Sequence, residues 1–239
     1  MHTDKNISKI KETDTNQFIN ITNSIEKIKI KKDLFNINNE NIKYNSLRNG
    51  NNGKIYFGYE KDIVNNKFNL DYLLMPKDNE YHEKFEGIQF KIEYDKNKLK
   101  YFIKDLGSGY GTFIILKTPL RIINNLLISI GYTFIFFFLS QENENLSLKL
   151  LTGDEQSEVY EYLPEQKIIT VGRDKSSDIF NEDKLLSRKQ CYIYCQRDEK
   201  DKIEWFIKDG DINGKKSAND TWMYCFKDTF IYDQMIFNI

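Results

Sequence analysis

The stretch Trp205-Phe206-Ile207-Lys208-Asp209 (WFIKD) is a short run of aromatic and β-branched residues, which is typical of a β-strand. Runs of the same kind recur between Gly, Asn and Asp turns along the chain, at 55–57, 88–94, 101–103, 168–171 and 191–195. Stripes of apolar residues with helical spacing are hard to find, and the chain has only 3 prolines. These features predict an all-β fold.

The WFIKD stretch has a counterpart in the first half of the chain, Tyr101-Phe102-Ile103-Lys104-Asp105 (YFIKD). Upstream of each stretch lie two more matching pairs: Phe57-Gly58-Tyr59-Glu60 with Val171-Gly172-Arg173-Asp174, and Gly87-Ile88-Gln89-Phe90 with Arg188-Lys189-Gln190-Cys191. Downstream, the turn at 106–113 corresponds to the turn at 217–222. Self-similarity of this kind indicates a tandem duplication.

The length of 239 residues suits two domains, because domains cluster at roughly 100 to 150 residues. The polar break at 140–145 (SQENEN) follows a strongly apolar stretch, and we expect the interdomain linker there. The predicted organisation is an Asn- and Lys-rich segment at 1–52 that includes the first strands of domain one, a first β-domain at 53–139, the linker, and a second β-domain at 146–239.

The second domain is expected to lack its last strand. It stops at 235–239, before the position at which the first half continues into a further strand at 133–139. Either the chain is truncated, or another segment such as 1–32 fills the gap by strand addition.

The composition excludes several classes of partner. Lys and Arg total 35 against 36 for Asp and Glu, so the positive field that holds a protein to nucleic acid or anionic lipid is missing. The longest apolar run, at 128–139, is shorter than the roughly 18 to 20 residues of a membrane-spanning helix. The polar start at 1–11 does not support a secretion signal. We therefore expect an intracellular protein, cytoplasmic or nuclear, without a nucleic-acid or membrane partner.

Neither a metal nor a cofactor is expected. The 3 cysteines and 2 histidines lack the close pairing of zinc ligands. The oxygen-bearing residues of 209–220 follow the spacing of an EF-hand calcium loop, but the flanks resemble strands, and Lys215 and Lys216 add positive charge. The glycine-rich turn at 107–112 is similar to the nucleotide loop of a protein kinase, yet no His-Arg-Asp or Asp-Phe-Gly follows it. We expect polar turns at both places and no catalysis.

An anion site is the remaining candidate. Arg173 ends a strand, and Ser187, Arg188 and Lys189 follow a short way downstream. A guanidinium presents a planar fork of donors that matches phosphate, and a nearby hydroxyl adds a further donor. Spacing alone leaves open whether these side chains converge in space.

The ordered set Gly172-Arg173, Ser177-Asp178-Ile179, Leu186-Ser187-Arg188, Trp205 to Asp209 and Ser217-x-Asn219-x-Thr221-Trp222 resembles the forkhead-associated (FHA) domain family over nearly all of 146–239. The resemblance implies an eleven-stranded β-sandwich whose loops at one end hold a phosphothreonine peptide. It also implies site roles. Arg173 and Ser187 would grip the phosphate, Arg188 would assist, and Asn219 would bond the peptide backbone, with Gly172, Gln190 and Thr221 as supporting residues.

Three departures from the family pattern predict weaker binding than is typical. Gln190 stands where the family usually has a histidine that braces the loop, and Ala218 offers no hydroxyl. Asp220 replaces a glycine and places a negative charge near a site for a dianion.

The first half resembles the same family more faintly and without its binding set. Tyr59 stands at the Arg position, Glu86 at the Ser position and Tyr110 at the Asn position. We therefore expect two tandem β-sandwiches. The second would be a non-catalytic phosphothreonine-peptide module for protein–protein interaction, and the first, degenerate copy would be a scaffold or a second protein contact. The alternative is a structural subunit of an assembly with a vestigial phosphate site.

Overall fold

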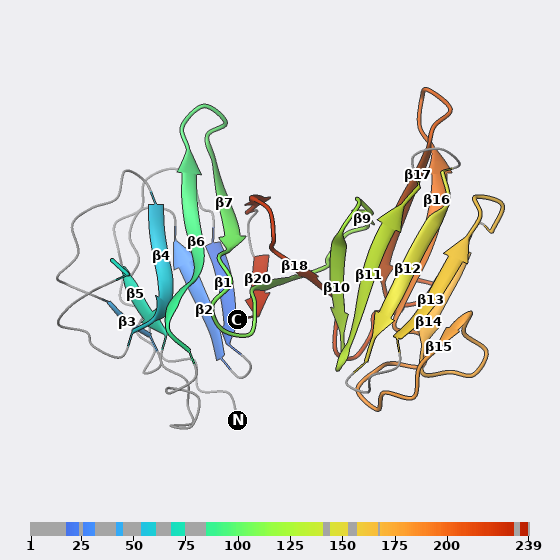
Figure 1. Cartoon of the computed structure of the whole chain (residues 1–239), viewed down its shortest axis with the longest axis horizontal. Coiled ribbons are helices and arrows are strands. Elements are labelled where there is room, and N and C mark those ends of the chain that lie inside the picture. Colours follow the sequence, from blue (N-terminus) through green and yellow to red (C-terminus); the bar gives the residue numbers. More distant parts are fainter. Residues whose placement is uncertain are drawn as a thin grey trace. The chain divides into compact units, whose positions relative to one another are not determined.

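Strands make up all of the regular secondary structure in the described part of the chain, so the all-β prediction is confirmed (Figure 1). The computed structural model describes the strands at 18–23, 26–31 and 42–44, and residues 54–60, 68–74, 85–140, 144–152, 157–166, 168–231 and 235–238. No helix within these ranges is long and apolar enough to cross a bilayer. The backbone divides into unit 1, at Met1–Ile114 with Cys225–Ile239, and unit 2, at Ile115–Tyr224.

Unit 2 has the architecture of a β-sandwich, with two sets of paired strands. One set runs in the order β13 (Ser157–Tyr162), β12 (Leu146–Leu151), β11 (Thr133–Leu139), β10 (Leu126–Ile130) and β18 (Trp222–Tyr224). The other runs in the order β15 (Ile179–Phe180), β14 (Ile168–Gly172), β16 (Cys191–Arg197), β17 (Ile203–Asp209) and β9 (Leu120–Arg121).

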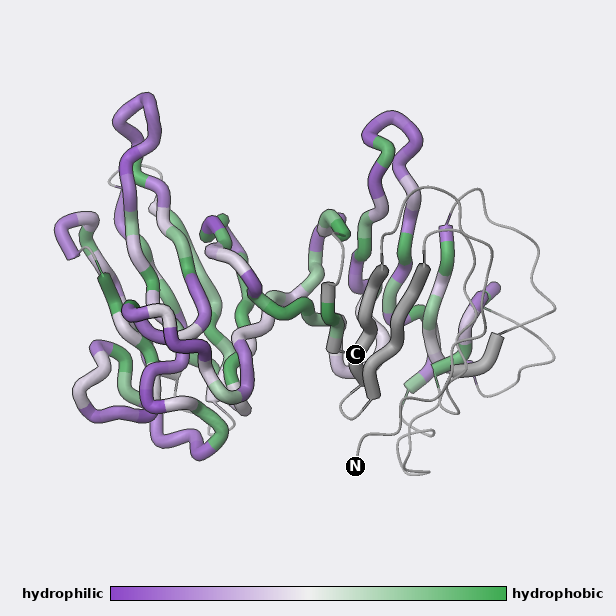
Figure 2. Tube along the Cα trace, turned by 180° about the vertical axis from the view of Figure 1, so that it is seen from behind, coloured by the Kyte–Doolittle hydropathy of each residue, from purple (hydrophilic) through white to green (hydrophobic). Residues whose placement is uncertain are grey.

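The core of unit 2 follows from alternating burial along these strands. In β12, Leu146, Leu148 and Leu150 are buried, and the residues between them are partly exposed. The WFIKD strand buries Trp205 and Ile207 in the same way. Apolar residues recur along the strands, whereas the loops that join them are mainly hydrophilic (Figure 2). Each large buried side chain contributes about 1.5 to 3 kcal/mol, so the alternation fixes which face of each strand turns inward.

Unit 1 is built from the remaining strands. One sheet runs in the order β19 (Thr229–Phe230), β7 (Lys100–Asp105), β6 (Gly87–Asp95), β4 (Lys54–Tyr59), β5 (Tyr72–Leu74) and β3 (Ile42–Tyr44). A second set runs in the order β8 (Phe113–Ile115), β20 (Met235–Asn238), β1 (Phe18–Asn23) and β2 (Glu26–Lys31). The segment 1–52 therefore supplies strands to unit 1. That the two units are tandem copies of one sandwich stays a prediction.

The boundary between the units differs from the expected linker at 140–145. That segment joins β11 to β12, which pair antiparallel, and the Ser140 N–H donates to the Asn145 carbonyl at 3.0 Å. The polar break thus connects two paired strands of unit 2, because polar residues suit a connection inside a domain as well as a linker between domains. The chain instead passes between the units after Ile114 and after Tyr224.

A reciprocal strand exchange follows from these two crossings. Unit 2 takes β9, β10 and β11 from the first half of the sequence, and unit 1 takes β19 and β20 from the second half. The short strands β9 and β19 pair at equivalent positions of WFIKD and YFIKD: Leu120 with Ile207 and Arg121 with Phe206, Thr229 with Ile103 and Phe230 with Phe102. The expected domains at 53–139 and 146–239 therefore each end in the other unit.

The exchange also corrects the expected gap in the second domain. In unit 2 the place beside β12 is taken by β11, and β10 lies next to it. The segment 1–32 does add a strand to the end of the second half, but it does so in unit 1, where β1 pairs parallel with β20. We predicted the added strand for the second domain, whereas the structure has it in unit 1. The prediction failed because the residue pattern of a strand does not identify the strand with which it pairs.

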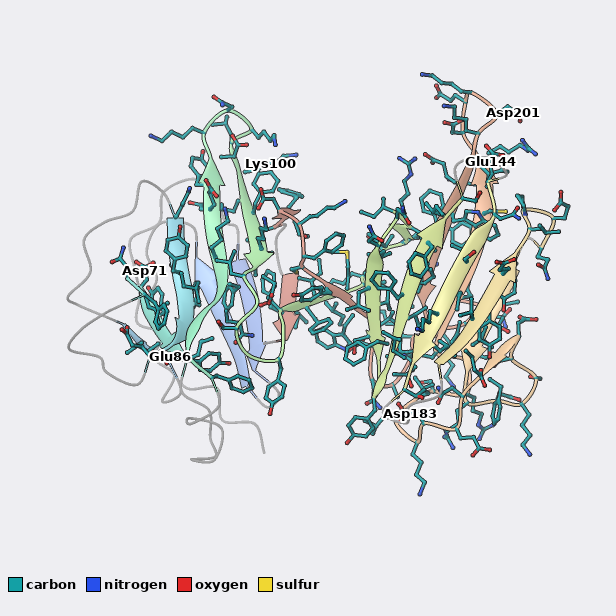
Figure 3. The ribbon with its side chains drawn as sticks, viewed as in Figure 1. Asp71, Glu86, Lys100, Glu144, Asp183 and Asp201 are labelled. Atoms are coloured by element: carbon teal, nitrogen blue, oxygen red, sulfur yellow. The ribbon has the colours of Figure 1, made fainter. Side chains whose placement is uncertain are left out.

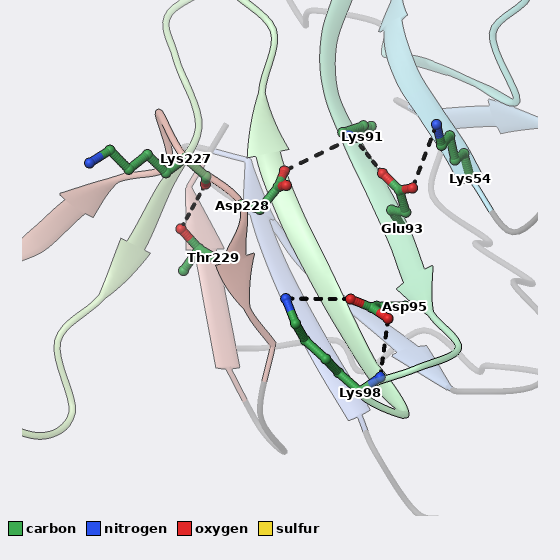
Figure 4. Close-up of polar contacts among 8 residues, drawn as sticks. All are labelled: Lys54, Lys91, Glu93, Asp95, Lys98, Lys227, Asp228 and Thr229. Atoms are coloured by element: carbon green, nitrogen blue, oxygen red, sulfur yellow. Dashed lines mark hydrogen bonds and ion pairs between the residues drawn. The ribbon is translucent and has the colours of Figure 1, made fainter.

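Surface ion pairs accompany the return of the second half to unit 1 (Figure 4). The Lys91 ammonium lies 4.0 Å from the Asp228 carboxylate, just before β19, and also pairs with Glu93. Lys54 extends this row, 3.5 Å from Glu93. Lys91 and Glu93 are half-buried, and ion pairs at a protein surface contribute about 0 to 1 kcal/mol each, so we attribute the position of the segment mainly to strand pairing and burial.

Candidate functional site

Arg173 lies at the end of β14, and its side chain is exposed. Its backbone N–H donates to the Ser187 carbonyl at 3.0 Å, and its Nε donates to the Leu186 carbonyl at 3.1 Å. Among the described residues, no carboxylate lies within ion-pair distance of this guanidinium. The Nε bond fixes the plane of the guanidinium and leaves its outer nitrogens for an external acceptor.

Ser187 lies on the loop between β15 and β16 and is half-buried. Its Oγ accepts a hydrogen bond from the Ala218 N–H at 2.7 Å, which joins this loop to the loop between β17 and β18. A hydroxyl that accepts one bond can still donate its proton to another acceptor. The Ser187 loop is thus fastened to the β17–β18 loop by this bond, and to Arg173 by the backbone bond between Arg173 and Ser187.

Asn219, on the loop between β17 and β18, is exposed next to this pair. Its Nδ2 donates to the Leu185 carbonyl at 2.6 Å, two residues before Ser187. Its own carbonyl accepts from the Trp222 indole N–H at 3.1 Å. The structure therefore places Arg173, Ser187 and Asn219 on three neighbouring loops at one end of unit 2.

Gln190 is fully buried beneath these loops and connects two of them. Its Oε1 accepts from the Ser187 N–H at 2.9 Å, and its Nε2 donates to the Asp220 carbonyl at 2.8 Å. A longer contact of 3.4 Å joins Nε2 to the Thr221 hydroxyl. The amide thus provides both a donor and an acceptor at the position where the family usually has histidine.

Thr221 hydrogen-bonds within the segment that joins β17 to β18. Its hydroxyl donates to the Asp209 carboxylate at 2.8 Å, and Ser217 donates to the same oxygen at 2.6 Å. Asp211 accepts two backbone N–H groups of the following turn. These carboxylates are used to shape a turn between strands, and within the described ranges no group of three His, Cys, Asp or Glu is placed to hold a metal ion.

Two backbone positions shape the site. At Gly172 a Cβ atom would lie 2.2 Å from the Arg188 carbonyl oxygen, so only glycine permits the close approach of β14 to the next loop. Asp220 has a φ of 58°, the left-handed conformation that favours glycine, and it carries a negative charge beside Asn219. The departure at Asp220 is therefore both conformational and electrostatic.

The cations beside Ser187 differ in their environments. Arg188 is exposed, and its role in binding stays a prediction. Lys189, to which the family resemblance assigned no role, reaches the hydroxyls of Ser176 and Ser177 at 3.1 and 3.2 Å. It holds the β14–β15 loop against the Ser187 loop, a link that the adjacent Ser-Ser and Arg-Lys pairs alone did not reveal.

In unit 1, aromatic side chains cluster at the end of β4. The Tyr59 ring is 5.4 Å from the Phe85 ring, and Phe85 meets Tyr110 edge-on at 4.8 Å. Burial, followed by the nearby Tyr110 and Asp105, raises the pKa of Tyr59 to about 12. Tyr59, which the sequence alignment of the two halves pairs with Arg173, is thus a buried phenol within this cluster.

This phenol makes unit 1 sensitive to alkali. A folded-state pKa above the ordinary value of 10.0 means that Tyr59 stabilises unit 1 fully below pH 10 and loses this contribution as the pH rises toward 12. Two pH units correspond to about 2 to 3 kcal/mol. We expect Tyr59→Phe to unfold at higher urea concentration than the wild type as the pH passes 10, with circular dichroism as the measurement. An unchanged difference between the two proteins across this range would contradict the assignment.

A comparison with known proteins finds a family that matches this part of the chain. The family model for the FHA domain matches residues 169–225, which run from β14 to the end of β18 and contain every residue described above for the unit 2 site. No curated protein and no solved structure matches the chain.

Proposed function

Starting from an FHA domain at residues 169–225, we propose that unit 2 binds a phosphothreonine-containing peptide of a partner protein and performs no catalysis. FHA domains are generally phosphopeptide-binding modules of protein–protein interaction, and they are typically non-catalytic. The observation that carries the proposal is the bond from the Arg173 N–H to the Ser187 carbonyl, which holds the backbone of an arginine with an exposed side chain next to that of a serine.

The proposed division of roles follows from the donors that each residue offers. The outer nitrogens of Arg173 form charge-assisted hydrogen bonds to the phosphate, the Ser187 hydroxyl donates a second contact, and Arg188 adds charge from the rim. Bonds to a charged group contribute about 1.5 to 3 kcal/mol each, so two or three of them support micromolar binding. Asn219 aligns the peptide backbone, because its amide lies beside the phosphate loop and its Nδ2 is already held by Leu185.

Selectivity for phosphothreonine over phosphoserine rests on one methyl group. A small apolar pocket for a methyl distinguishes two ligands by about 1 to 3 kcal/mol, which is roughly 5- to 150-fold in affinity. Unit 1 serves in this proposal as a scaffold or as a second protein contact, since Tyr59 replaces the arginine at its corresponding end.

One observation favours the alternative of a structural subunit with a vestigial phosphate site. Asp220 places a carboxylate next to Asn219, and it does so in a conformation that glycine would adopt more readily. Like charges weaken the binding of a dianion. The affinity for phosphorylated peptides separates the two functions.

The test is fluorescence anisotropy of the full chain with three degenerate peptide libraries that differ only at a central phosphothreonine, phosphoserine or threonine. We expect saturable binding of the phosphothreonine library, weaker binding of the phosphoserine library and none of the unphosphorylated one. Equal affinity for the phosphorylated and unphosphorylated libraries would favour the structural subunit.

A further inference from the structure

A turn from the first half of the sequence lies against the loop between β15 and β16 of unit 2, which carries Ser187. Gly131 and Tyr132 join β10 to β11, and the Tyr132 N–H donates to the Asp183 carboxylate at 2.6 Å. Gly131 has a φ of 56°, and a Cβ there would lie 2.5 Å from Asp183 Oδ2 and 3.1 Å from Leu185 Cβ. The turn thus approaches the segment before Ser187 as closely as a glycine backbone allows, although it lies outside the residues that match the FHA model.

Asp183 ties this turn to the loop that carries the site. Its other carboxylate oxygen accepts from the Leu185 N–H at 2.8 Å, and its carbonyl accepts from the Leu186 N–H at 3.0 Å. Asp183 lies at the end of unit 2 where β10 and β11 join (Figure 3). A single carboxylate therefore holds the turn and the 185–187 segment in one arrangement.

Two large apolar side chains are exposed on this junction. Tyr132 is 77% exposed and Leu185 is 38% exposed, although each belongs to a backbone segment held by hydrogen bonds. Leu185 is also the residue whose carbonyl accepts from Asn219 at 2.6 Å. We call Tyr132 and Leu185 the apolar lip. A backbone already held by hydrogen bonds loses little conformational freedom on contact with a ligand, and tyrosine is enriched at interfaces.

We propose that the apolar lip contacts one apolar side chain that flanks the phosphothreonine and so sets the sequence preference of the site. This inference rests on the proposed function, because the lip reads a peptide that Arg173 and Ser187 anchor. The bond between Asn219 and Leu185 places the lip next to the residue that aligns the peptide backbone, within reach of a neighbouring side chain. One of the two residues of the apolar lip, Tyr132, thus comes from the turn between β10 and β11, the strands that unit 2 takes from the first half of the sequence.

The test is a positional scan of phosphothreonine peptides in which each flanking position is varied in turn among apolar, polar and charged residues. We expect the wild-type chain to prefer an apolar residue at one flanking position by about 5- to 10-fold. The double variant Tyr132→Ser with Leu185→Ser should lose this preference and keep its affinity for polar-flanked peptides within about 2-fold. Val159→Ser is the matched control, since Val159 is 64% exposed on β13 of the same unit.

The outcomes separate this inference from the proposed function. A preference that survives in the double variant, or the absence of any preference in the wild type, would overturn the role of the lip and leave phosphothreonine binding intact. Binding of the wild type that does not depend on the phosphate would overturn both. Loss of the preference in Val159→Ser as well would assign it to the unit as a whole, against the lip.

Discussion

The variant Arg173→Ala is expected to bind phosphothreonine peptides at least about 100-fold more weakly than the wild type. The substitution removes two charge-assisted hydrogen bonds, each worth about 1.5 to 3 kcal/mol, and every 1.4 kcal/mol is tenfold in affinity. Folding should be little affected, because the side chain is exposed and, among the described residues, its hydrogen bond goes to the Leu186 carbonyl. Isothermal titration with a single phosphothreonine peptide selected from the libraries measures the loss.

Two further variants define what the loss means. Arg173→Lys keeps the charge but not the planar fork, so we expect an intermediate affinity. Arg121→Ala removes an exposed arginine whose partner is Glu204, at 2.8 Å, and binding should not change. If Arg173→Ala bound the peptide as tightly as Arg121→Ala, the anion site would be vestigial and the structural function would stand.

The variant Gln190→Leu is expected to lower the free energy of unfolding of unit 2 by about 3 to 5 kcal/mol. The Ser187 N–H and the Asp220 carbonyl, both partly buried, would lose their bonds to the fully buried Gln190 amide, and each unsatisfied group costs about 1 to 3 kcal/mol. Urea unfolding followed by tryptophan fluorescence reports on this unit specifically, since both tryptophans, Trp205 and Trp222, belong to it.

The first unit supplies the matched control. Gln89 is equally buried, and its Nε2 donates to the Gly111 carbonyl at 3.1 Å. Gln89→Leu should leave both the tryptophan transition and peptide affinity unchanged. In unit 2, Gln190→His keeps a donor and an acceptor and should retain more binding than Gln190→Leu. An unaltered urea midpoint in Gln190→Leu would show that Gln190 does not brace the loops.

The local features of this fold could be predicted from the sequence. The WFIKD strand, the glycine at 172 and the all-β class follow from side-chain type and from turn residues, which act over a few positions. The family resemblance suggested that Arg173 and Ser187 lie close together, and in the structure their backbones are joined by a hydrogen bond of 3.0 Å. Their function in binding remains the proposal that the experiments above test.

The strand exchange could not be predicted, and the reason is physical. Phe206 and Ile207 of WFIKD present the same edge as Phe102 and Ile103 of YFIKD, so either edge suits the short strand that follows either half. The backbone N–H and C=O groups at a strand edge are the same in both halves of the chain, so they do not select between two partner strands. Alternating burial specifies only which face of a strand turns toward the core. The Asp183 contact with Tyr132 was missed for the same reason, because it joins residues on opposite sides of the expected linker.

The crossings after Ile114 and Tyr224 also determine when the protein can mature during synthesis. The body of unit 1 is translated first, yet β19 and β20 follow only after roughly 110 further residues, a delay on the order of 5 to 20 seconds at about 5 to 20 residues per second. Throughout that interval the growing polypeptide exposes an unfinished edge at β7. Such an edge is a natural substrate for chaperones, and a premature stop before residue 225 would leave it permanently open.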